Sequence, residues 1–148
     1  MRAVVTAVNE AAVTIDGRTV GSIGKGFLVL LGVAPEDTEA QAKRLADKIC
    51  NLRVFEDEAG KMNLNLAAVG GEVLVVSQFT LYANCKKGNR PSFVKAAGPD
   101  IAIPMYERFM ELVREHGFHV EHGEFGAMME VSSVNNGPVT IIMDTDEL

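Results

Sequence analysis

The sequence predicts a single α/β domain in which two helices pack on a mixed, barrel-like β-sheet. Two observations lead to this fold class: many short stretches typical of β-strands, and only two stretches with the spacing of an amphipathic helix. The chain of 148 residues is long enough to close one hydrophobic core, and its 47% hydrophobic and 23% charged residues are globular values. Because no repeat, linker or low-complexity segment divides it, we expect residues 1–148 to form one domain.

The first half of the chain supplies most of the predicted strands. Five segments have strand-like composition: residues 2–8, 11–15, 19–23, 27–33 and 73–76. Asp16-Gly17 favours a tight hairpin turn between the second and the third of them. The last two segments are continuous apolar runs, which indicate strands covered on both faces.

Two helices are predicted, each with one buried face. Over residues 38–51 the apolar positions recur with helical spacing, and Asp37 or Thr38 can cap the first turn; the buried stripe is Ala42, Leu45, Ala46 and Ile49. A second helix is expected from about Pro104 to His116, since proline is tolerated in a first turn; it buries Met105, Phe109, Leu112 and Val113. Three strands should follow, over residues 118–122, 127–134 and 139–144.

Composition and charge argue against several classes of protein. The net charge of −6 disfavours a protein that coats nucleic acid through phosphate contacts, although it allows a grip on a short single-stranded end. Cys50 and Cys85 lie far apart and provide neither a disulfide framework nor paired metal spacing. No apolar run approaches the roughly 18 residues of a membrane span, and Asn9 and Glu10 interrupt the N-terminus before a signal-peptide core can form. We therefore expect a cytoplasmic protein that does not bind a membrane.

Three histidines form the first candidate site. His116, His119 and His122, with Glu121 and Glu124 nearby, have the chemistry of metal ligands. A glycine breaks the helix after His116, and on a strand His119 and His122 point to opposite faces. We therefore expect surface histidines and no metal.

A basic loop around Cys85 is the second candidate. Lys86 and Lys87 could lower the pKa of the thiol and make it a nucleophile, but no histidine lies close in the sequence to act as its base, which favours an incidental cysteine. The loop carries no acid as far as Lys95, and in an acidic protein Lys86, Lys87 and Arg90 are candidate phosphate contacts. A solvated loop is the plainer alternative.

A pair of polar segments is the third candidate. They are Ser77-Gln78-Phe79-Thr80-Leu81 and Asn135-Asn136-Gly137-Pro138-Val139-Thr140. Taken alone, the first is the end of a buried strand, and the second is a hairpin turn with a proline at a strand start. Together they resemble the two signature motifs of the D-aminoacyl-tRNA deacylases of bacterial and eukaryotic type, Ser-Gln-x-x-Leu and Asn-x-Gly-Pro-x-Thr, at every fixed position. Further stretches typical of that family, between Asn51 and Ala127, follow in the right order.

The resemblance implies a three-layer α/β/β fold with both helices on one side, a homodimer, no cofactor and no metal. It also implies hydrolysis of the ester that joins a D-amino acid to the 3′ end of tRNA. Glycyl-tRNA should be cleaved too, because it offers no side chain to reject. The rival hypothesis is a non-catalytic RNA-binding module, although a chain with two tyrosines and no tryptophan shows no array of stacking aromatics.

Roles follow from the resemblance residue by residue. The catalytic wall around the scissile carbonyl is Ser77, Gln78, Phe79 and Thr80. Substrate is bound by two pairs of residues. Gly137 and Pro138 are joined by a cis bond and reach in from the partner subunit as a chirality filter. Phe125 and Met129 flank the aminoacyl group. Near the N-terminus the family usually has Gln-Arg where this chain has Thr6-Ala7, and that arginine helps to hold the Gly-Pro element. The departure at Thr6-Ala7 therefore leaves the rigidity of the filter as an open question for this chain.

These residue types suit the chemistry. An aminoacyl ester is already activated, so the site needs mainly to position water and to stabilise an oxyanion, which backbone amides around Phe79 and Thr80 can do. There are two candidate nucleophiles. One is a water molecule assisted by the substrate's vicinal ribose hydroxyl, and the other is the hydroxyl of Thr80. At position 137 a glycine lets the main chain approach the substrate closely and leaves no room for an L side chain.

Overall fold

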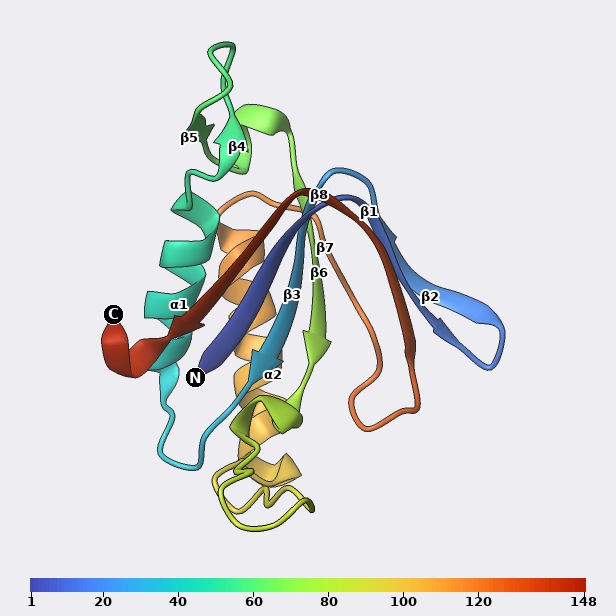
Figure 1. Cartoon of the computed structure of the whole chain (residues 1–148), viewed down its shortest axis with the longest axis vertical. Helices are drawn as coiled ribbons and strands as arrows, with labels where there is room; N and C mark the ends of the chain where they lie inside the picture. The colour runs from blue at the N-terminus through green and yellow to red at the C-terminus, as the bar shows by residue number, and fades with distance from the viewer.

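The computed structural model describes residues 1–148, which form two α-helices, eight strands and three short 3-10 turns (Figure 1). The helices are α1 (Glu39–Asn51) and α2 (Pro99–Glu115). The strands are β1 (Arg2–Ile15), β2 (Arg18–Ile23), β3 (Gly26–Gly32), β4 (Phe55–Glu56), β5 (Met62–Leu64), β6 (Glu72–Ser77), β7 (Val120–His122) and β8 (Glu130–Asp144). The 3-10 turns are η1 (Ala67–Val69), η2 (Phe79–Tyr82) and η3 (Thr145–Glu147). Neither helix is long and apolar enough to cross a membrane.

One strongly curled sheet contains most of the strands. Its order is β2-β1-β3-β6-β7, with β8 paired to β1; β3, β6 and β7 run parallel and the other pairs are antiparallel. The long strand β1 pairs with β3 through its first half and with β2 through its second half, and it bends together with β8 at the upper end of the sheet (Figure 1). The curl nearly closes into a barrel where β2 meets β7, since a Cβ on Gly21 would lie 2.5 Å from the carbonyl oxygen of His122.

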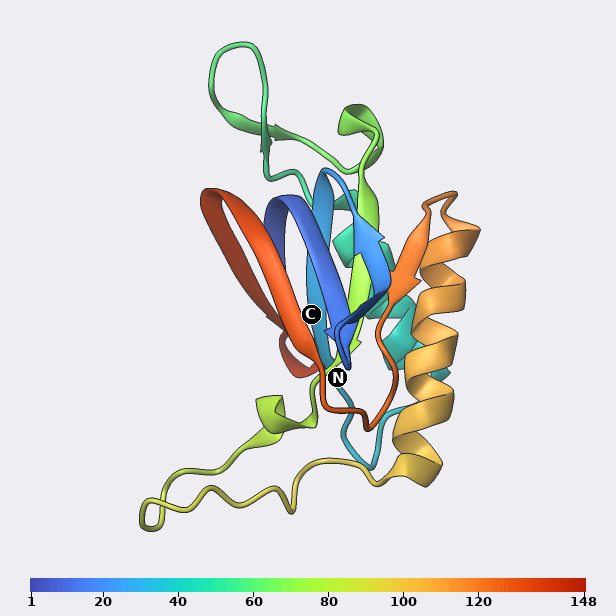
Figure 2. The same ribbon diagram turned by 90° about the vertical axis from the view of Figure 1, so that its right-hand side faces the viewer.

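Two hydrophobic clusters fill the space on either side of this sheet. The larger joins both helices to one face of the sheet through fully buried side chains such as Phe27, Leu45, Ile49 and Phe109. The smaller lies inside the curl and consists of Val8, Ala11, Val13, Ile23, Leu28, Leu74 and Val76. Figure 2 shows α2 along one side of the sheet and β8 on the other. The predicted α/β domain with two helices packed on one side of barrel-like sheet layers is therefore confirmed.

Several local predictions are also confirmed. The Asp16-Gly17 hairpin joins β1 to β2, and both residues have the positive φ that such a turn needs. The first predicted helix is α1, with Thr38 as its N-cap. The apolar runs over residues 27–33 and 73–76 correspond to β3 and β6, which lie side by side in the centre of the sheet.

Other predicted boundaries are wrong. Residues 2–8 and 11–15 are halves of the single strand β1, and residues 127–134 and 139–144 are joined through β8, so the predicted hairpin at Asn136-Gly137 does not exist. The local sequence would end a strand at these irregular positions. The pairing between β1 and β8 continues on both sides of them, so each strand remains unbroken. Helix α2 begins at Pro99 and not at Pro104, and the interior proline lies on the exposed side, where it removes one backbone hydrogen bond. Strand β7 is shorter than residues 118–122.

Candidate active site

A cavity of about 580 Å³ opens at the carboxyl end of β6. It is lined by Val76, Ser77, Gln78, Phe79, Ala97, Pro99, Phe125, Gly126, Ala127, Met128, Met129 and Val131. The fold thus brings together three residues of the first polar segment, Ser77, Gln78 and Phe79, with Phe125 and Met129 from the loop before β8. Thr80 follows directly but does not line this cavity.

The η2 turn presents free backbone donors beside this cavity. As the first residues of a 3-10 helix, Phe79 and Thr80 have amides without an intrahelical acceptor, and neither amide donates to any other backbone carbonyl. The turn is held at its start by Gln78, whose amide donates to the carbonyl oxygen of Leu31 at 2.7 Å. The Gln78 side chain also donates to the Thr80 hydroxyl. Two adjacent unused amides are the kind of donors that stabilise an oxyanion.

Arg2 fixes the other end of the η2 turn. Its guanidinium donates to the carbonyl oxygen of Leu81 at 3.1 Å and to Asp144 at 2.7 Å, and it stacks 4.5 Å above the Tyr82 ring. Burial of Asp144 opposes its ionisation, but the hydrogen bonds from Arg2 and from the Asp146 amide prevail and lower the pKa of the carboxyl. Arg2 thereby joins the start of β1, the end of β8 and the turn that carries Thr80.

The basic loop is attached to the same turn. The loop is closed by two backbone hydrogen bonds between Asn84 and Ser92, at 2.7 and 2.9 Å. Phe93 then packs edge-on against Phe79, with ring centroids 5.1 Å apart. Within this loop Lys86, Lys87 and Arg90 are exposed and form no ion pair. The loop projects from the end of the domain that carries η2 (Figure 2).

Gly137 lies in a different place. It lines a cavity of about 330 Å³ with residues of β1 and of the β4–β5 hairpin, among them Ala7, Phe55 and Met62. Its bond to Pro138 is cis, and the β1–β8 register shifts at this position, opposite Ala7. Gly137 has φ +118°, and a Cβ there would lie 2.8 Å from the Val139 side chain. Within one chain the structure therefore does not bring Gly137-Pro138 to the Ser77 cavity.

No histidine or cysteine lines the Ser77 cavity or the Gly137 cavity. His116 pairs with Asp47 and His119 with Glu121, each at 2.8 Å, whereas the Nδ1 of His122 bonds to the Gly123 carbonyl. No group of three or more His, Cys, Asp or Glu side chains is arranged to hold a metal ion. Cys85 is exposed; Cys50 is buried, and burial raises the pKa of its thiol to about 12.

Sequence reasoning missed seven lining residues of the Ser77 cavity: Val76, Ala97, Pro99, Gly126, Ala127, Met128 and Val131. Ala97 lies just before α2 and Pro99 is the first residue of this helix, which was predicted to begin later. Met128 stands at the rim with its side chain 93% exposed. An exposed methionine next to the predicted Met129 is a signal that hydropathy patterning could have provided, because apolar side chains gathered at an opening often mark a binding surface.

Comparison with known proteins gives a consistent result. The family model described as D-Tyr-tRNA(Tyr) deacylase matches residues 4–144. A D-aminoacyl-tRNA deacylase of Thermus aquaticus is 60% identical over 147 residues, covering 99% of this chain and 97% of the relative. One of Desulfatibacillum aliphaticivorans is 59% identical, covering 98% and 99%.

Solved structures share the fold. A structure described as c-Myc DNA Unwinding Element Binding Protein superposes with a TM-score of 0.91 at 42% identity, covering 97% of this chain and 98% of that one. A probable eukaryotic D-amino acid tRNA deacylase superposes with a TM-score of 0.83 at 16% identity, covering 96% and 97%.

Proposed function

The chain belongs to the D-Tyr-tRNA(Tyr) deacylase family, and on that premise we propose that it hydrolyses the ester bond of D-aminoacyl-tRNA and spares the L form. The observation that carries this proposal is the Ser77 cavity, which Phe79 lines together with an apolar wall that includes Phe125 and Met129. The turn that borders this cavity leaves the amides of Phe79 and Thr80 unused. The wall accepts the aminoacyl side chain, and the amides lie next to the ester carbonyl.

Water is the proposed nucleophile. Its oxygen adds to the ester carbonyl carbon, and the amides of Phe79 and Thr80 stabilise the resulting oxyanion. The tetrahedral intermediate then collapses, the 3′ oxygen of the tRNA leaves and takes the proton that the attacking water gives up through the vicinal ribose hydroxyl, and free D-amino acid and tRNA are released. The Thr80 hydroxyl is less suited to attack, because its hydrogen-bond partner is the amide of Gln78, which is not a base.

A homodimer completes the proposed site. Strand β8 pairs only with β1, so its other edge is free along the strand, and the apolar side chains of Val131, Val134 and Ile142 on it are exposed, Ile142 by 78%. A long exposed edge with apolar residues favours pairing with a second chain. We propose that the second copy covers β8 and carries its Gly137-Pro138 to the Ser77 cavity, where the main chain holds the substrate amino group and excludes an L side chain.

The tRNA is proposed to run along the basic loop. Because Phe93 packs on Phe79, the loop that carries the exposed Lys86, Lys87 and Arg90 is attached to a residue that lines the Ser77 cavity, and we propose that the terminal phosphates of a bound tRNA pass along this loop. Glycyl-tRNA is a further proposed substrate, since it has no side chain for the filter to exclude. The cytoplasm, where charged tRNA occurs, is the proposed location.

A deacylation assay tests the function. We expect rapid release of the amino acid from D-tyrosyl-tRNA and glycyl-tRNA, and at least tenfold slower release from L-tyrosyl-tRNA. Equal rates on the D and L esters would refute chiral selection. Binding of D-tyrosyl-tRNA without release would support the RNA-binding module instead.

Variants at Gly137 and Ala7 test the filter. Gly137→Ala places a methyl group against Val139 and should lower the rate on the D ester. Gly60→Ala is the matched control, because Gly60 also has a positive φ, but no atom lies within 4 Å of its added Cβ. Ala7→Arg restores the family's usual residue beside Gly137 and should raise the D-to-L rate ratio. If Gly137→Ala behaves like Gly60→Ala in a folded dimer, Gly137 takes no part in selection.

A further inference from the structure

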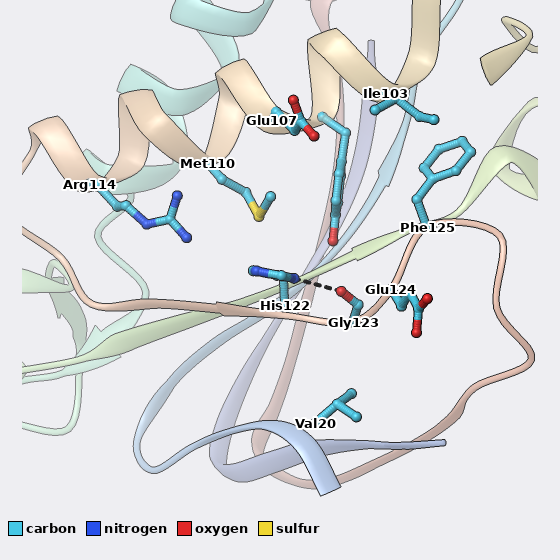
Figure 3. A pocket seen from close by; sticks show the side chains of 10 residues that line it. Val20, Ile103, Glu107, Met110, Arg114, His122, Gly123, Glu124 and Phe125 are labelled. Atoms are coloured by element: carbon cyan, nitrogen blue, oxygen red, sulfur yellow. Dashed lines mark hydrogen bonds between the residues drawn. The ribbon is translucent and has the colours of Figure 1, made fainter. Parts of the chain in front are cut away.

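We propose that a second pocket, between α2 and the segment that follows β7, binds a free amino acid with an apolar side chain. The pocket has a volume of about 530 Å³ and is lined by Val20, Ile103, Tyr106, Glu107, Met110, Arg114, His122, Gly123, Glu124 and Phe125 (Figure 3). Its volume lies in the range of pockets that bind small molecules. None of the residues that line it has a part in the proposed reaction except Phe125, which also lines the Ser77 cavity.

One face of α2 forms the first wall. Ile103, Glu107, Met110 and Arg114 follow one another at helical spacing, so they point to the same side. Met110 and Tyr106 are buried at the base of this wall, and the Tyr106 hydroxyl is already engaged with the carbonyl oxygen of Val75. The wall thus offers an apolar floor, and Figure 3 shows the Arg114 guanidinium and the Glu107 carboxylate on either side of Met110.

The charged groups around the pocket have no partner in the protein. Arg114, Glu107 and Glu124 form neither an ion pair nor a side-chain hydrogen bond. By contrast, Arg108, on another face of the same helix, is paired with three glutamates. Charges of both signs left unpaired around an apolar floor fit a ligand that itself carries both signs.

His122 contributes a hydrogen-bond acceptor to the pocket. Its Nδ1 lies 2.6 Å from the carbonyl oxygen of Gly123, and since a carbonyl only accepts, this nitrogen carries the hydrogen. In the neutral ring Nε2 is therefore an acceptor, suited to an ammonium group. The ligand's ammonium is assigned to Nε2 of His122 with Glu107, its carboxylate to Arg114, and its side chain to the apolar side chains of Ile103, Met110 and Phe125. Glu124 lies beyond Gly123, away from Nε2 (Figure 3).

The binding experiment uses the whole protein labelled with ¹⁵N and titrated with L-leucine. The L form is chosen because the proposed chirality filter rejects it, so this test does not depend on the proposed function. We expect saturable shifts of the amides of Met110, Arg114 and Gly123, with a Kd on the order of 1 mM, the affinity typical of a ligand of about ten heavy atoms. N-acetyl-leucine lacks the ammonium and leucinamide lacks the carboxylate, so each should bind at least about tenfold more weakly.

Variants locate the site. Arg114→Ala and Glu107→Gln should each weaken L-leucine binding by about tenfold. Arg44→Ala is the matched control, because Arg44 is an exposed arginine of α1 that also has no partner, and it should leave binding unchanged. The proposal is overturned if L-leucine causes no saturable shift, if the blocked derivatives bind equally well, or if the shifts are confined to the amides of Ser77–Thr80.

Discussion

The hydroxyl of Tyr106 in α2 donates a hydrogen bond to the carbonyl oxygen of Val75 in β6 at 3.0 Å. Both groups are buried, and burial raises the pKa of the phenol to about 12, so the hydroxyl keeps its proton at neutral pH. Val75 lies just before the end of β6 at Ser77, and the Tyr106 ring lies against Phe125, with centroids 6.3 Å apart. One side chain therefore supports both the Ser77 cavity and the α2 pocket.

Tyr106→Phe should lower the free energy of unfolding by about 1–3 kcal/mol, because it removes the donor and leaves a buried carbonyl with poorer hydrogen bonding. The lower end is expected, since the amide of Gly123 also reaches the Val75 oxygen, at 3.4 Å. Urea unfolding measures the change. Tyr82→Phe is the control, because the Tyr82 hydroxyl donates no hydrogen bond, and an equal loss in both variants would contradict the assignment.

Cys50 should make the protein less stable in mild alkali. Its pKa is about 12 in the folded chain against 9.0 for an unperturbed thiol, so above pH 9 the unfolded state loses a proton that the folded state keeps. The contribution is fully present below pH 9 and is lost as pH rises toward 12. Between pH 8 and pH 10 the unfolding free energy should fall by about 1 kcal/mol from this group.

Cys50→Ala isolates that effect. The variant is less stable at every pH because it leaves a cavity in the core, but its unfolding free energy should decline less between pH 8 and pH 10 than that of the native chain. Parallel curves for the two proteins would show that the thiol does not titrate as described.

Cys85 should be dispensable. It is exposed and lines none of the cavities described above, so we expect an alkylating reagent at neutral pH to modify Cys85 and to spare the buried Cys50. Deacylation of D-tyrosyl-tRNA by Cys85→Ala, and by native protein treated with a chelator, should stay within about twofold of the untreated native rate. Loss of activity in either case, with folding intact, would show that the reaction requires a thiol or a metal.

Local chemistry decided the parts of the fold that the sequence predicted well. Asp16-Gly17 has the turn preference that its backbone needs, and the stripe from Ala42 to Ile49 is buried as its spacing indicates. The motif of Ser77 and Gln78 follows a buried strand, as the apolar run before it indicates, and it lines a cavity there.

Pairing between distant residues decided the rest. Strand β8 continues through Gly137-Pro138 because β1 pairs with it on both sides of that point, and local preference for a turn does not survive such pairing. In the same way, nothing in the sequence near Arg2 indicates that its guanidinium lies between Leu81 and Asp144. Such contacts are set by the curl of the sheet, which brings both ends of the chain beside the η2 turn.

Arg2 is the residue whose removal should separate catalysis from binding. It makes no contact with the Ser77 cavity itself, but it holds the carbonyl of Leu81 within the turn that supplies the amides of Phe79 and Thr80. Without it the turn can shift, and small displacements of oxyanion donors cost rate steeply. Arg2→Ala should therefore lower kcat on D-tyrosyl-tRNA by about tenfold or more and leave KM nearly unchanged.

The comparison of three variants distinguishes positioning from general destabilisation. Arg2→Lys keeps a cation that can bond either Asp144 or Leu81 but not both in the planar geometry of the guanidinium, so its kcat should fall between those of the native chain and Arg2→Ala. Arg18→Ala removes an exposed arginine of β2 that has no partner, and its kcat should match the native value. Urea unfolding measures the free energy of unfolding of each variant. If Arg2→Ala is destabilised but turns over D-tyrosyl-tRNA at the native kcat, Arg2 supports the fold alone and has no part in positioning the η2 turn for catalysis.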